Sequence, residues 1–269
     1  MVIDGTFQMP DSGADLQGSP PVFSEGCIGL FDSGLGGFSI LREVRQLLPS
    51  ADILYVADNA SVPYGNKPEA FIRDRARILT QFLLDHGARG ILIACNTATA
   101  LSADSLRETF SIPIIAVEPA VKPAVRESRT KTIAVLATAR TLACQRFDRL
   151  IHQFADGCRV LTDPCDGWVG LVEKGDFDTP ETERVVRRTL DPMLAEGADV
   201  FVLGCTHYPF LIPVIERVVA GRAVILNPAP AVARQLVRQL DRTGFSGGGG
   251  RTILVTTGAP YSETIIRTL

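Results

Sequence analysis

The stretch ILIACNTATA (Ile91–Ala100) returns 110 residues later as FVLGCTHYPF (Phe201–Phe210). In both, a short apolar run passes through a cysteine, Cys95 or Cys205, into polar residues. A continuous apolar run of this length is typical of a strand that is buried on both faces of a parallel sheet. The sequence therefore predicts two buried strands, each with a cysteine directly after its carboxyl end.

Two more pairs of stretches repeat in the same order. IGLFDSG (Ile28–Gly34) resembles IAVLATA (Ile133–Ala139) at an offset of 105 residues. ILYVADNA (Ile53–Ala60) resembles CRVLTDPC (Cys158–Cys165) at the same offset. Three ordered matches at nearly one offset indicate an internal duplication. We therefore expect two similar domains related by pseudo-twofold symmetry, with the active site in the cleft between them.

Runs rich in β-forming residues alternate with helical stretches along the chain. The clearest helix is expected over Pro68–His86, with Gly87 just past its end. Alternating β and α units predict an α/β fold in which each domain is a mostly parallel sheet flanked by helices. Ligands meet the carboxyl ends of the strands in such sheets. The predicted strands are Ile28–Phe31, Ile53–Val56, Ile91–Ala94, Ile112–Val117, Ile133–Leu136, Arg159–Leu161, Val200–Leu203, Ala223–Leu226 and Ile253–Thr256.

The length of 269 residues suits one large domain or two of middling size, and the duplication favours two. Residues 27–117 plus 234–269 are expected to form the first domain, and residues 118–233 the second. Residues 1–26 are rich in Gly, Pro, Ser and Asp, which is typical of a disordered arm. The run Gly247–Gly250 predicts a flexible connection, followed by a strand that rejoins the first domain.

Bulk composition narrows the class of partner. A formal net charge of −3 provides no basic field for nucleic acid or an anionic membrane. No apolar run approaches the ~20 residues of a membrane span, and the amino terminus lacks the pattern of a secretory signal. We therefore expect a cytoplasmic protein without a nucleic-acid or membrane partner.

The six cysteines include no C-x-x-C pair, and the three histidines lie far apart in the sequence. This pattern argues against a zinc site and against a disulfide framework in a cytoplasmic chain. By default each cysteine is a small buried apolar residue. Four side chains are interpreted as core or surface residues, namely Cys144, Cys158, Cys165 and Trp168.

Cys95 and Cys205 stand apart because they occupy equivalent places in a duplicated chain. If a helix starts after each, its positive end would favour a thiolate and would equally bind a substrate carboxylate. For either cysteine alone, a buried residue capping a strand is the alternative. Two equivalent thiols suit the inversion of a carbon centre, where one group removes a proton from one face and the other delivers a proton to the opposite face.

Polar residues near the two cysteines are candidate assistants. Asp32 could orient or deprotonate a nearby thiol and Ser33 could bind substrate, although either could instead cap a helix. The turn after Asp32 lacks the full G-x-G-x-x-G dinucleotide spacing. His207 could assist Cys205, the alternative being a structural histidine. The turn Pro63–Gly65 could face the substrate.

At these residues the chain resembles the glutamate racemase family, part of the aspartate/glutamate racemase superfamily, from about Ile28 to Leu240. Jointly, and in this order, the motifs that carry the resemblance are specific. They are FDSGLGG (Phe31–Gly37), VPYGNK (Val62–Lys67), ACNTA (Ala94–Ala98), LATARTL (Leu136–Leu142), LVEKG around Glu173, and LGCTHYP (Leu203–Pro209).

The resemblance implies roles for individual residues. Cys95 and Cys205 look like the two acid/base residues, Asp32 like the partner of Cys95, and His207 and Glu173 like assistants of Cys205. By analogy, Cys205 works on the L-enantiomer and Cys95 on the D-enantiomer. The residues that look like substrate contacts are Asp32, Ser33, Pro63, Tyr64, Gly65, Asn96, Thr97, Thr138 and Thr206.

The resemblance also implies the wider function. The family supplies D-glutamate for bacterial peptidoglycan, and it needs neither pyridoxal phosphate nor a metal, so no cofactor is expected. Its members often form dimers, so a homodimer is an expectation. Some relatives with an amino-terminal extension bind a peptidoglycan precursor as an activator, which makes that precursor a candidate partner. The chain departs from many relatives at Asn227–Pro228, where they carry Asp-Ser, and in its extra amino-terminal arm and glycine-rich tail.

Several alternatives remain beside this reading. In aspartate racemases an acidic residue more often stands where this chain has His207. The FDSG and PYGNK motifs point away from a hydantoin racemase, and an arylmalonate-type decarboxylase needs only one of the two thiols. A two-lobed binding protein for an acidic amino acid would not need paired thiols, which are an oxidation liability. Exchange of the α-proton separates an enzyme from such a binding protein.

Overall fold

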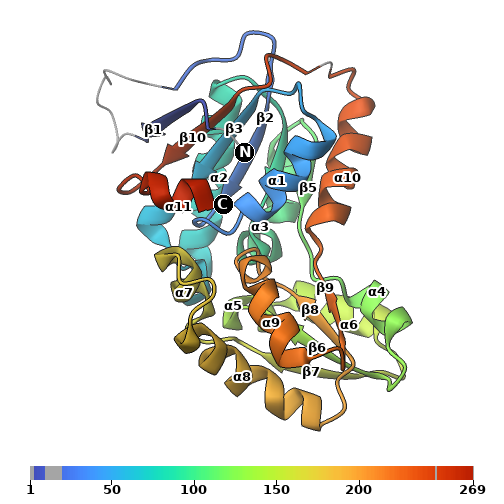
Figure 1. The fold of residues 1–269 in the computed structure, drawn as a ribbon. Coiled ribbons are helices and arrows are strands. Elements are labelled where there is room, and N and C mark those ends of the chain that lie inside the picture. Colours follow the sequence, from blue (N-terminus) through green and yellow to red (C-terminus); the bar gives the residue numbers. More distant parts are fainter. Residues whose placement is uncertain (1–2, 10–19, 246, 269) are drawn as a thin grey trace. The chain divides into compact units, whose positions relative to one another are not determined.

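The computed structural model describes residues 3–9, 20–245 and 247–268, and the chain divides into two compact units (Figure 1). Unit 1 comprises the described residues up to Val117 and from Ala229 onward, and unit 2 comprises Glu118–Pro228. The chain re-enters unit 1 at Ala229 rather than at 234. The reason is that α10 (Ala229–Asp241) is one continuous helix that packs on α1 (Phe38–Leu47).

The sheet of unit 1 is parallel throughout, with strand order β1-β10-β3-β2-β4-β5. Every residue of β2, β3 and β10 is buried, as expected for apolar strands covered on both faces. The strands are β1 (Gly5–Gln8), β2 (Cys27–Asp32), β3 (Ile53–Ala57), β4 (Ala88–Ile93), β5 (Ile114–Ala116) and β10 (Thr252–Thr256).

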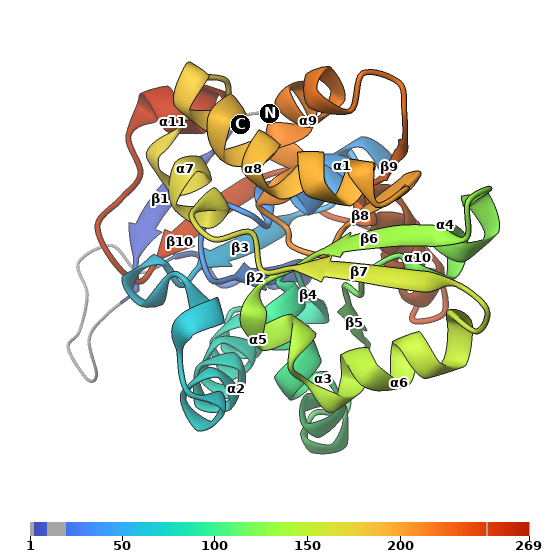
Figure 2. The same ribbon diagram turned by 90° about the horizontal axis from the view of Figure 1, so that it is seen from below.

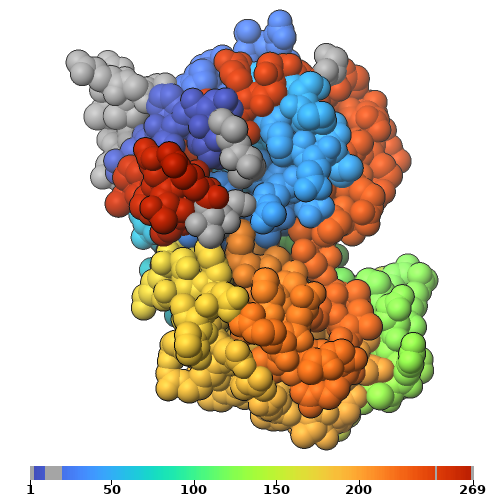
Figure 3. Space-filling view, in the orientation of Figure 1, coloured from blue at the N-terminus to red at the C-terminus, as the bar shows by residue number. Residues whose placement is uncertain are grey.

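Helices cover both faces of this sheet. α1 and α10 pack together, side by side at the surface of unit 1 (Figure 3), and α2 (Glu69–Asp85) packs with α3 (Asn96–Thr109) on β2, β4 and β5 (Figure 2). α2 closely matches the predicted helix, with Pro68 at its N-cap and Gly87 in the left-handed conformation after its end, φ +94°. Shorter elements are η1 (Asn59–Ser61), η2 (Tyr64–Asn66) and α11 (Glu263–Thr268).

Unit 2 has a four-stranded parallel sheet in the order β7-β6-β8-β9. Its central strands β6 (Thr132–Leu136) and β8 (Val200–Leu203) are fully buried, whereas the edge strands β7 (Arg159–Asp163) and β9 (Val224–Leu226) are partly exposed. The helices α7, α8 and α9 lie on one face, and α4, α5 and α6 on the other (Figure 2). They are α4 (Val121–Glu127), α5 (Ala139–Leu142), α6 (Gln145–Phe154), α7 (Trp168–Lys174), α8 (Pro180–Ala195) and α9 (Ile212–Val219), with the turn η3 (Tyr208–Leu211) before α9.

The two sheets repeat one pattern, β3-β2-β4-β5 in unit 1 and β7-β6-β8-β9 in unit 2. Phe31 pairs with Ile93 in the first, and Leu136 with Leu203 in the second. Residues that follow these pairs therefore emerge together at the carboxyl end of each sheet, which is where parallel sheets bind ligands.

The amino-terminal segment differs from the disordered arm expected over residues 1–26. Gly5–Gln8 form β1 and pair with β10, and the Asp4 carboxylate accepts a hydrogen bond from Thr252 N at 2.6 Å. Phe23 N donates to the His86 carbonyl at 3.0 Å, which ties the segment before β2 to the end of α2. Residues 1–2 and 10–19 of the expected arm lie outside the described residues.

The glycine run is likewise held in place rather than flexible over its described residues. Gly248 N and Gly250 N donate to the Ser50 carbonyl at 2.9 and 3.0 Å, and Gly249 N donates to Asp52 Oδ1 at 3.0 Å. A Cβ on Gly248 would stand 2.7 Å from Asp52 Cγ, so only glycine allows this close approach. The backbone N–H groups of Gly249 and Arg251 thus bind the Asp52 carboxylate, which also pairs with the Arg251 side chain at 2.6 Å.

Within the described part of the chain, no helix combines the length and the apolar character required to cross a bilayer.

Candidate active site

Cys95 lies at the carboxyl end of β4 and is the N-cap residue of α3. The hydrogen bond from Ala94 N to the Phe31 carbonyl, 2.8 Å, carries the strand pairing up to the cysteine, and the Cys95 carbonyl accepts from Thr99 N at 2.9 Å. The helix therefore starts directly at the thiol, which is only 4% exposed. Its amino-terminal dipole favours negative charge at this position.

A hydroxyl and a carboxylate line up beside this thiol. Cys95 Sγ donates to Ser33 Oγ at 3.9 Å, and Ser33 Oγ donates to Asp32 Oδ1 at 3.4 Å. Asp32 Oδ2 accepts from Gly37 N at 2.6 Å, just before α1. Asp32 thus binds the backbone just before α1 and also ends the line of groups from the thiol. Gly37 permits the arrangement, since a Cβ there would stand 2.5 Å from the Tyr55 hydroxyl.

The other candidates of unit 1 surround Cys95 along α3 and η2. Asn96 and Thr97 form the first turn of α3 and are each 3% exposed. Among the described residues Asn96 Oδ1 has no hydrogen-bond partner, while its Nδ2 donates to the Val117 carbonyl at 3.5 Å. The segment Pro63–Gly65 leads into η2, which packs on α3, and the Val62–Pro63 peptide bond is cis.

Asp58 is a buried carboxylate of unit 1 that the sequence analysis did not identify as a site residue. It directly follows β3 and accepts hydrogen bonds from the Tyr64 hydroxyl at 2.5 Å, from Arg75, and from Thr257 Oγ1 at 2.7 Å. Burial alone would raise the pKa of Asp58, but these hydrogen bonds and the charge of Arg75 hold it below its ordinary value. Its place after a buried strand was a usable signal, but its partners come from distant segments.

Cys205 follows β8 in unit 2, with a histidine and a glutamate in line behind it. Cys205 Sγ lies 3.7 Å from His207 Nδ1, and His207 Nε2 lies 2.7 Å from Glu173 Oε1. Cys205 is 6% and His207 2% exposed. A thiol, an imidazole and a carboxylate in this order can move a proton to and from the sulfur. Glu173, the last of the three, is supplied by α7.

Two threonines complete the candidates of unit 2. Thr138 follows β6, the strand paired with β8, so it emerges at the same end of the sheet as Cys205. Its Oγ1 caps α5 by accepting from Thr141 N at 3.3 Å. Thr206, 3% exposed, lies between Cys205 and His207. The structure therefore distributes the predicted residues over two half-sites: Asp32, Ser33, Pro63, Tyr64, Gly65, Cys95, Asn96 and Thr97 in unit 1, and Thr138, Glu173, Cys205, Thr206 and His207 in unit 2.

Of the remaining cysteines, Cys27, Cys144 and Cys165 are buried and Cys158 is partly exposed. Burial, aided by the nearby Asp52 charge, raises the pKa of Cys27 to about 12. Burial and the Asp163 charge raise the pKa of Cys165 well above its ordinary value. Cys144 Sγ accepts from Phe147 N at 3.4 Å and so caps α6. All six cysteines are free thiols.

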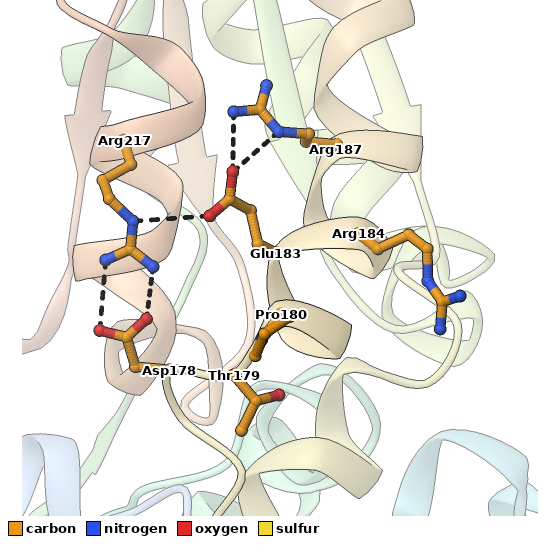
Figure 4. A pocket seen from close by; sticks show the side chains of 7 residues that line it. All are labelled: Asp178, Thr179, Pro180, Glu183, Arg184, Arg187 and Arg217. Atoms are coloured by element: carbon orange, nitrogen blue, oxygen red, sulfur yellow. Dashed lines mark hydrogen bonds and ion pairs between the residues drawn. The ribbon is translucent and has the colours of Figure 1, made fainter.

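A cavity of about 530 Å³ in unit 2 lies apart from the predicted residues (Figure 4). It opens at the amino terminus of α8, and its charges compensate one another: Arg217 pairs with Asp178, and Arg187 with Glu183 at 2.8 Å. This cavity is therefore not a candidate for the active site. No group of three or more His, Cys, Asp or Glu side chains in the described ranges could hold a metal ion. The cavity is lined by Asp178, Thr179, Pro180, Glu183, Arg184, Arg187 and Arg217.

The chain is similar to known racemases. A family model described as Asp/Glu/Hydantoin racemase matches residues 39–236. A glutamate racemase of Ectopseudomonas mendocina is 47% identical over 220 residues, covering 81% of this chain and 84% of the relative. The structure of a glutamate racemase from Francisella tularensis in complex with D-glutamate is 28% identical, with a TM-score of 0.77, covering 88% of this chain and 90% of that one. A glutamate racemase from Escherichia coli in complex with L-glutamate and the activator UDP-MurNAc-ala is 29% identical, with a TM-score of 0.75, covering 86% and 98%.

Proposed function

The chain belongs to the Asp/Glu/hydantoin racemase family and, within it, to the glutamate racemases, and on that premise we propose that it interconverts L- and D-glutamate by two-base proton transfer. Cys95 and Cys205 are the two bases, and the reaction needs no cofactor. The observation that carries this proposal is the matched placement of the thiols. Each follows the same strand of a repeated sheet, and each has its own line of polar groups, Ser33–Asp32 or His207–Glu173.

In the proposed reaction the thiolate of one cysteine removes the α-proton, and the thiol of the other protonates the opposite face of the carbanion-like centre. Afterwards the two thiols have exchanged protonation states, and the reverse reaction starts from that form. Cys205 works on L-glutamate and Cys95 on D-glutamate.

Substrate binding also stabilises the developing charge. The amino-terminal end of α3, where Asn96 and Thr97 form the first turn, favours the negative charge of a carboxylate. Fixed donors of this kind, held in a site from which water is excluded, supply most of the stabilisation of a carbanion. In this proposal Thr138 and Thr206 of unit 2 contribute hydroxyls to the substrate. Unit 1 contributes contacts from Ser33, Tyr64 and the rest of the Pro63–Gly65 loop.

The product is proposed to serve peptidoglycan synthesis in the cytoplasm, in keeping with six free thiols. The Escherichia coli relative was solved with UDP-MurNAc-ala as activator. We extend that activator to this chain, and an unchanged rate on adding UDP-MurNAc-L-Ala would contradict the extension.

Proton NMR of L-glutamate in D₂O with purified, chelator-treated protein tests the proposal. The α-proton signal should disappear while optical activity decays to zero. Persistence of both, with or without the precursor, would leave a binding protein as the better account. L-Aspartate in parallel identifies the substrate, since faster exchange of aspartate would point to an aspartate racemase.

A further inference from the structure

Asp58 joins three separate parts of unit 1 at the carboxyl end of its sheet. It is fully buried. Arg75 of α2 binds it through Nε and Nη2 at 2.9 and 2.8 Å, Thr257 after β10 binds it at 2.7 Å, and Tyr64 of η2 binds it at 2.5 Å. The fork of an arginine fixes the plane of the carboxylate, so the Tyr64 hydroxyl has a rigid acceptor.

Tyr64 links this cluster to the helix that starts at Cys95, because η2 packs on α3. Its side chain is 1% exposed, η2 packs on α3, and the charge of Cys95 contributes to raising the Tyr64 pKa, after the larger effects of burial and Asp58. Tyr64 therefore stays a neutral phenol whose hydroxyl is directed to Asp58, and its ring lies beside the Cys95 half-site.

The segment after β10 also binds the loop between β3 and α2. Thr257 Oγ1 accepts from Ala60 N at 3.2 Å, Gly258 N donates to Asn59 Oδ1 at 2.7 Å, and Asn59 Nδ2 donates to the Ala259 carbonyl at 2.7 Å. The loop between β3 and α2 is thus fastened along its first residues, with Asp58 as the shared partner of the fastening and of Tyr64.

We propose that Asp58 is a positioning residue for substrate binding, which with Arg75 and Thr257 holds Tyr64 and the Pro63–Gly65 loop in the conformation that contacts glutamate. This inference rests on the proposed racemase function. Asp58 does not take part in proton transfer, because its oxygens are already occupied by Tyr64, Arg75 and Thr257. Its loss should weaken binding of both enantiomers rather than slow either proton transfer.

The chain offers a matched control at the opposite end of the same strand. Asp52 precedes β3 as Asp58 follows it, is 4% exposed, and is paired with an arginine, Arg251, at 2.6 Å. Its backbone donors are Gly249 and Arg251, which lie at the end of the sheet away from Cys95. Asp52→Asn therefore damages an ion pair of another buried aspartate, with a more exposed arginine, without touching the loop between β3 and α2.

The experiment compares kcat and KM for both enantiomers in Asp58→Asn, Tyr64→Phe, the double variant and Asp52→Asn, with melting temperatures alongside. Asp58→Asn should raise KM at least about tenfold for each enantiomer while kcat stays within about threefold. Because Asp58 acts through Tyr64, the double variant should match the more impaired single variant instead of multiplying the two effects. Asp52→Asn should lower the melting temperature and leave KM within about twofold.

Thr257→Val keeps the test decisive if Asp58→Asn does not fold. It removes one hydrogen bond to Asp58 at the edge of the cluster and should raise KM about threefold. An unchanged KM in the folded variants, or multiplying effects in the double variant, would overturn the positioning role. Such results with an active wild type leave the proposed function intact, whereas a wild type that cannot exchange the α-proton overturns the proposed function itself.

Discussion

Cys95 and Cys205 end equivalent strands but differ in what surrounds the sulfur. Cys95 caps α3 and contacts Ser33, whereas Cys205 faces His207, and the turn η3 intervenes before α9 begins. An imidazole with a carboxylate behind it accepts a proton directly, but Asp32 reaches Cys95 through a hydroxyl. Each proton transfer should therefore depend on its own partner.

Glu173→Gln should slow proton transfer at Cys205 selectively, by about 10–100-fold, because the carboxylate no longer supports His207. The equilibrium constant between the enantiomers must stay at unity. Isotope effects measured in the two directions therefore show which of the two proton transfers has been slowed. With α-deuterated L-glutamate the isotope effect should grow, and with α-deuterated D-glutamate it should shrink. Glu183→Gln changes a partly exposed ion-pair residue of the same unit; it is the control and should change neither isotope effect.

Asp32→Asn should give the mirror-image result. The amide oxygen can still accept from Gly37 N, so this hydrogen bond before α1 is kept while the charge near Cys95 is lost. The isotope effect with α-deuterated D-glutamate should grow and that with the L-enantiomer should shrink. Equal changes for both enantiomers would contradict the assignment of Asp32 to Cys95.

At the scale of elements, the loop before β10 packs against the side chain of Asp52, which lies far away in the sequence. Gly248→Ala should destabilise the protein by about 1–3 kcal/mol, because the new methyl group would stand 2.7 Å from Asp52 Cγ. Gly249→Ala is the control, since its Cβ would meet nothing nearer than 3.5 Å, and its effect should stay within about 0.5 kcal/mol. Urea unfolding of the two variants measures the difference, and equal losses would refute the close-approach argument.

Asp58 also makes the stability of unit 1 sensitive to acid. Because folding lowers its pKa, its contribution to stability is present above the unfolded-state value of about 3.9 and is lost as pH falls through the folded value. The difference in unfolding free energy between wild type and Asp58→Asn should therefore shrink as pH falls below about 4. A difference that stays constant or widens on acidification would contradict this linkage.

Most elements could be predicted because their signals are local. Apolar runs located the strands from Ile28–Phe31 to Ile253–Thr256, and proline and glycine marked the ends of α2. β1 was missed because it is four residues long and only partly buried, so its sequence carries no apolar run. The glycine run was wrongly predicted to be flexible. Its composition indicates that many conformations are accessible, but it does not indicate that the Asp52 carboxylate binds the run.

At the scale of the whole molecule, the duplication was accessible from the sequence, because motifs recur at nearly one offset, whereas the strand orders β3-β2-β4-β5 and β7-β6-β8-β9 come from the structure. The equivalent positions of Cys95 and Cys205 followed from that repeat. The cluster around Asp58 did not, because Thr257 lies 199 residues away and no local pattern links the two. The pairing of β10 with β3 in the folded sheet brings such partners together.

The central claim is that two thiols on opposite faces perform the inversion, and racemisation by Cys95→Ala and Cys205→Ala in D₂O tests it most directly. Each variant should lose at least about a thousandfold in rate while keeping its fold, because each lacks one proton donor or acceptor. Any remaining deuterium exchange should occur without inversion, into L-glutamate for Cys95→Ala and into D-glutamate for Cys205→Ala. Racemisation by either variant at more than about a tenth of the wild-type rate would contradict the two-thiol account.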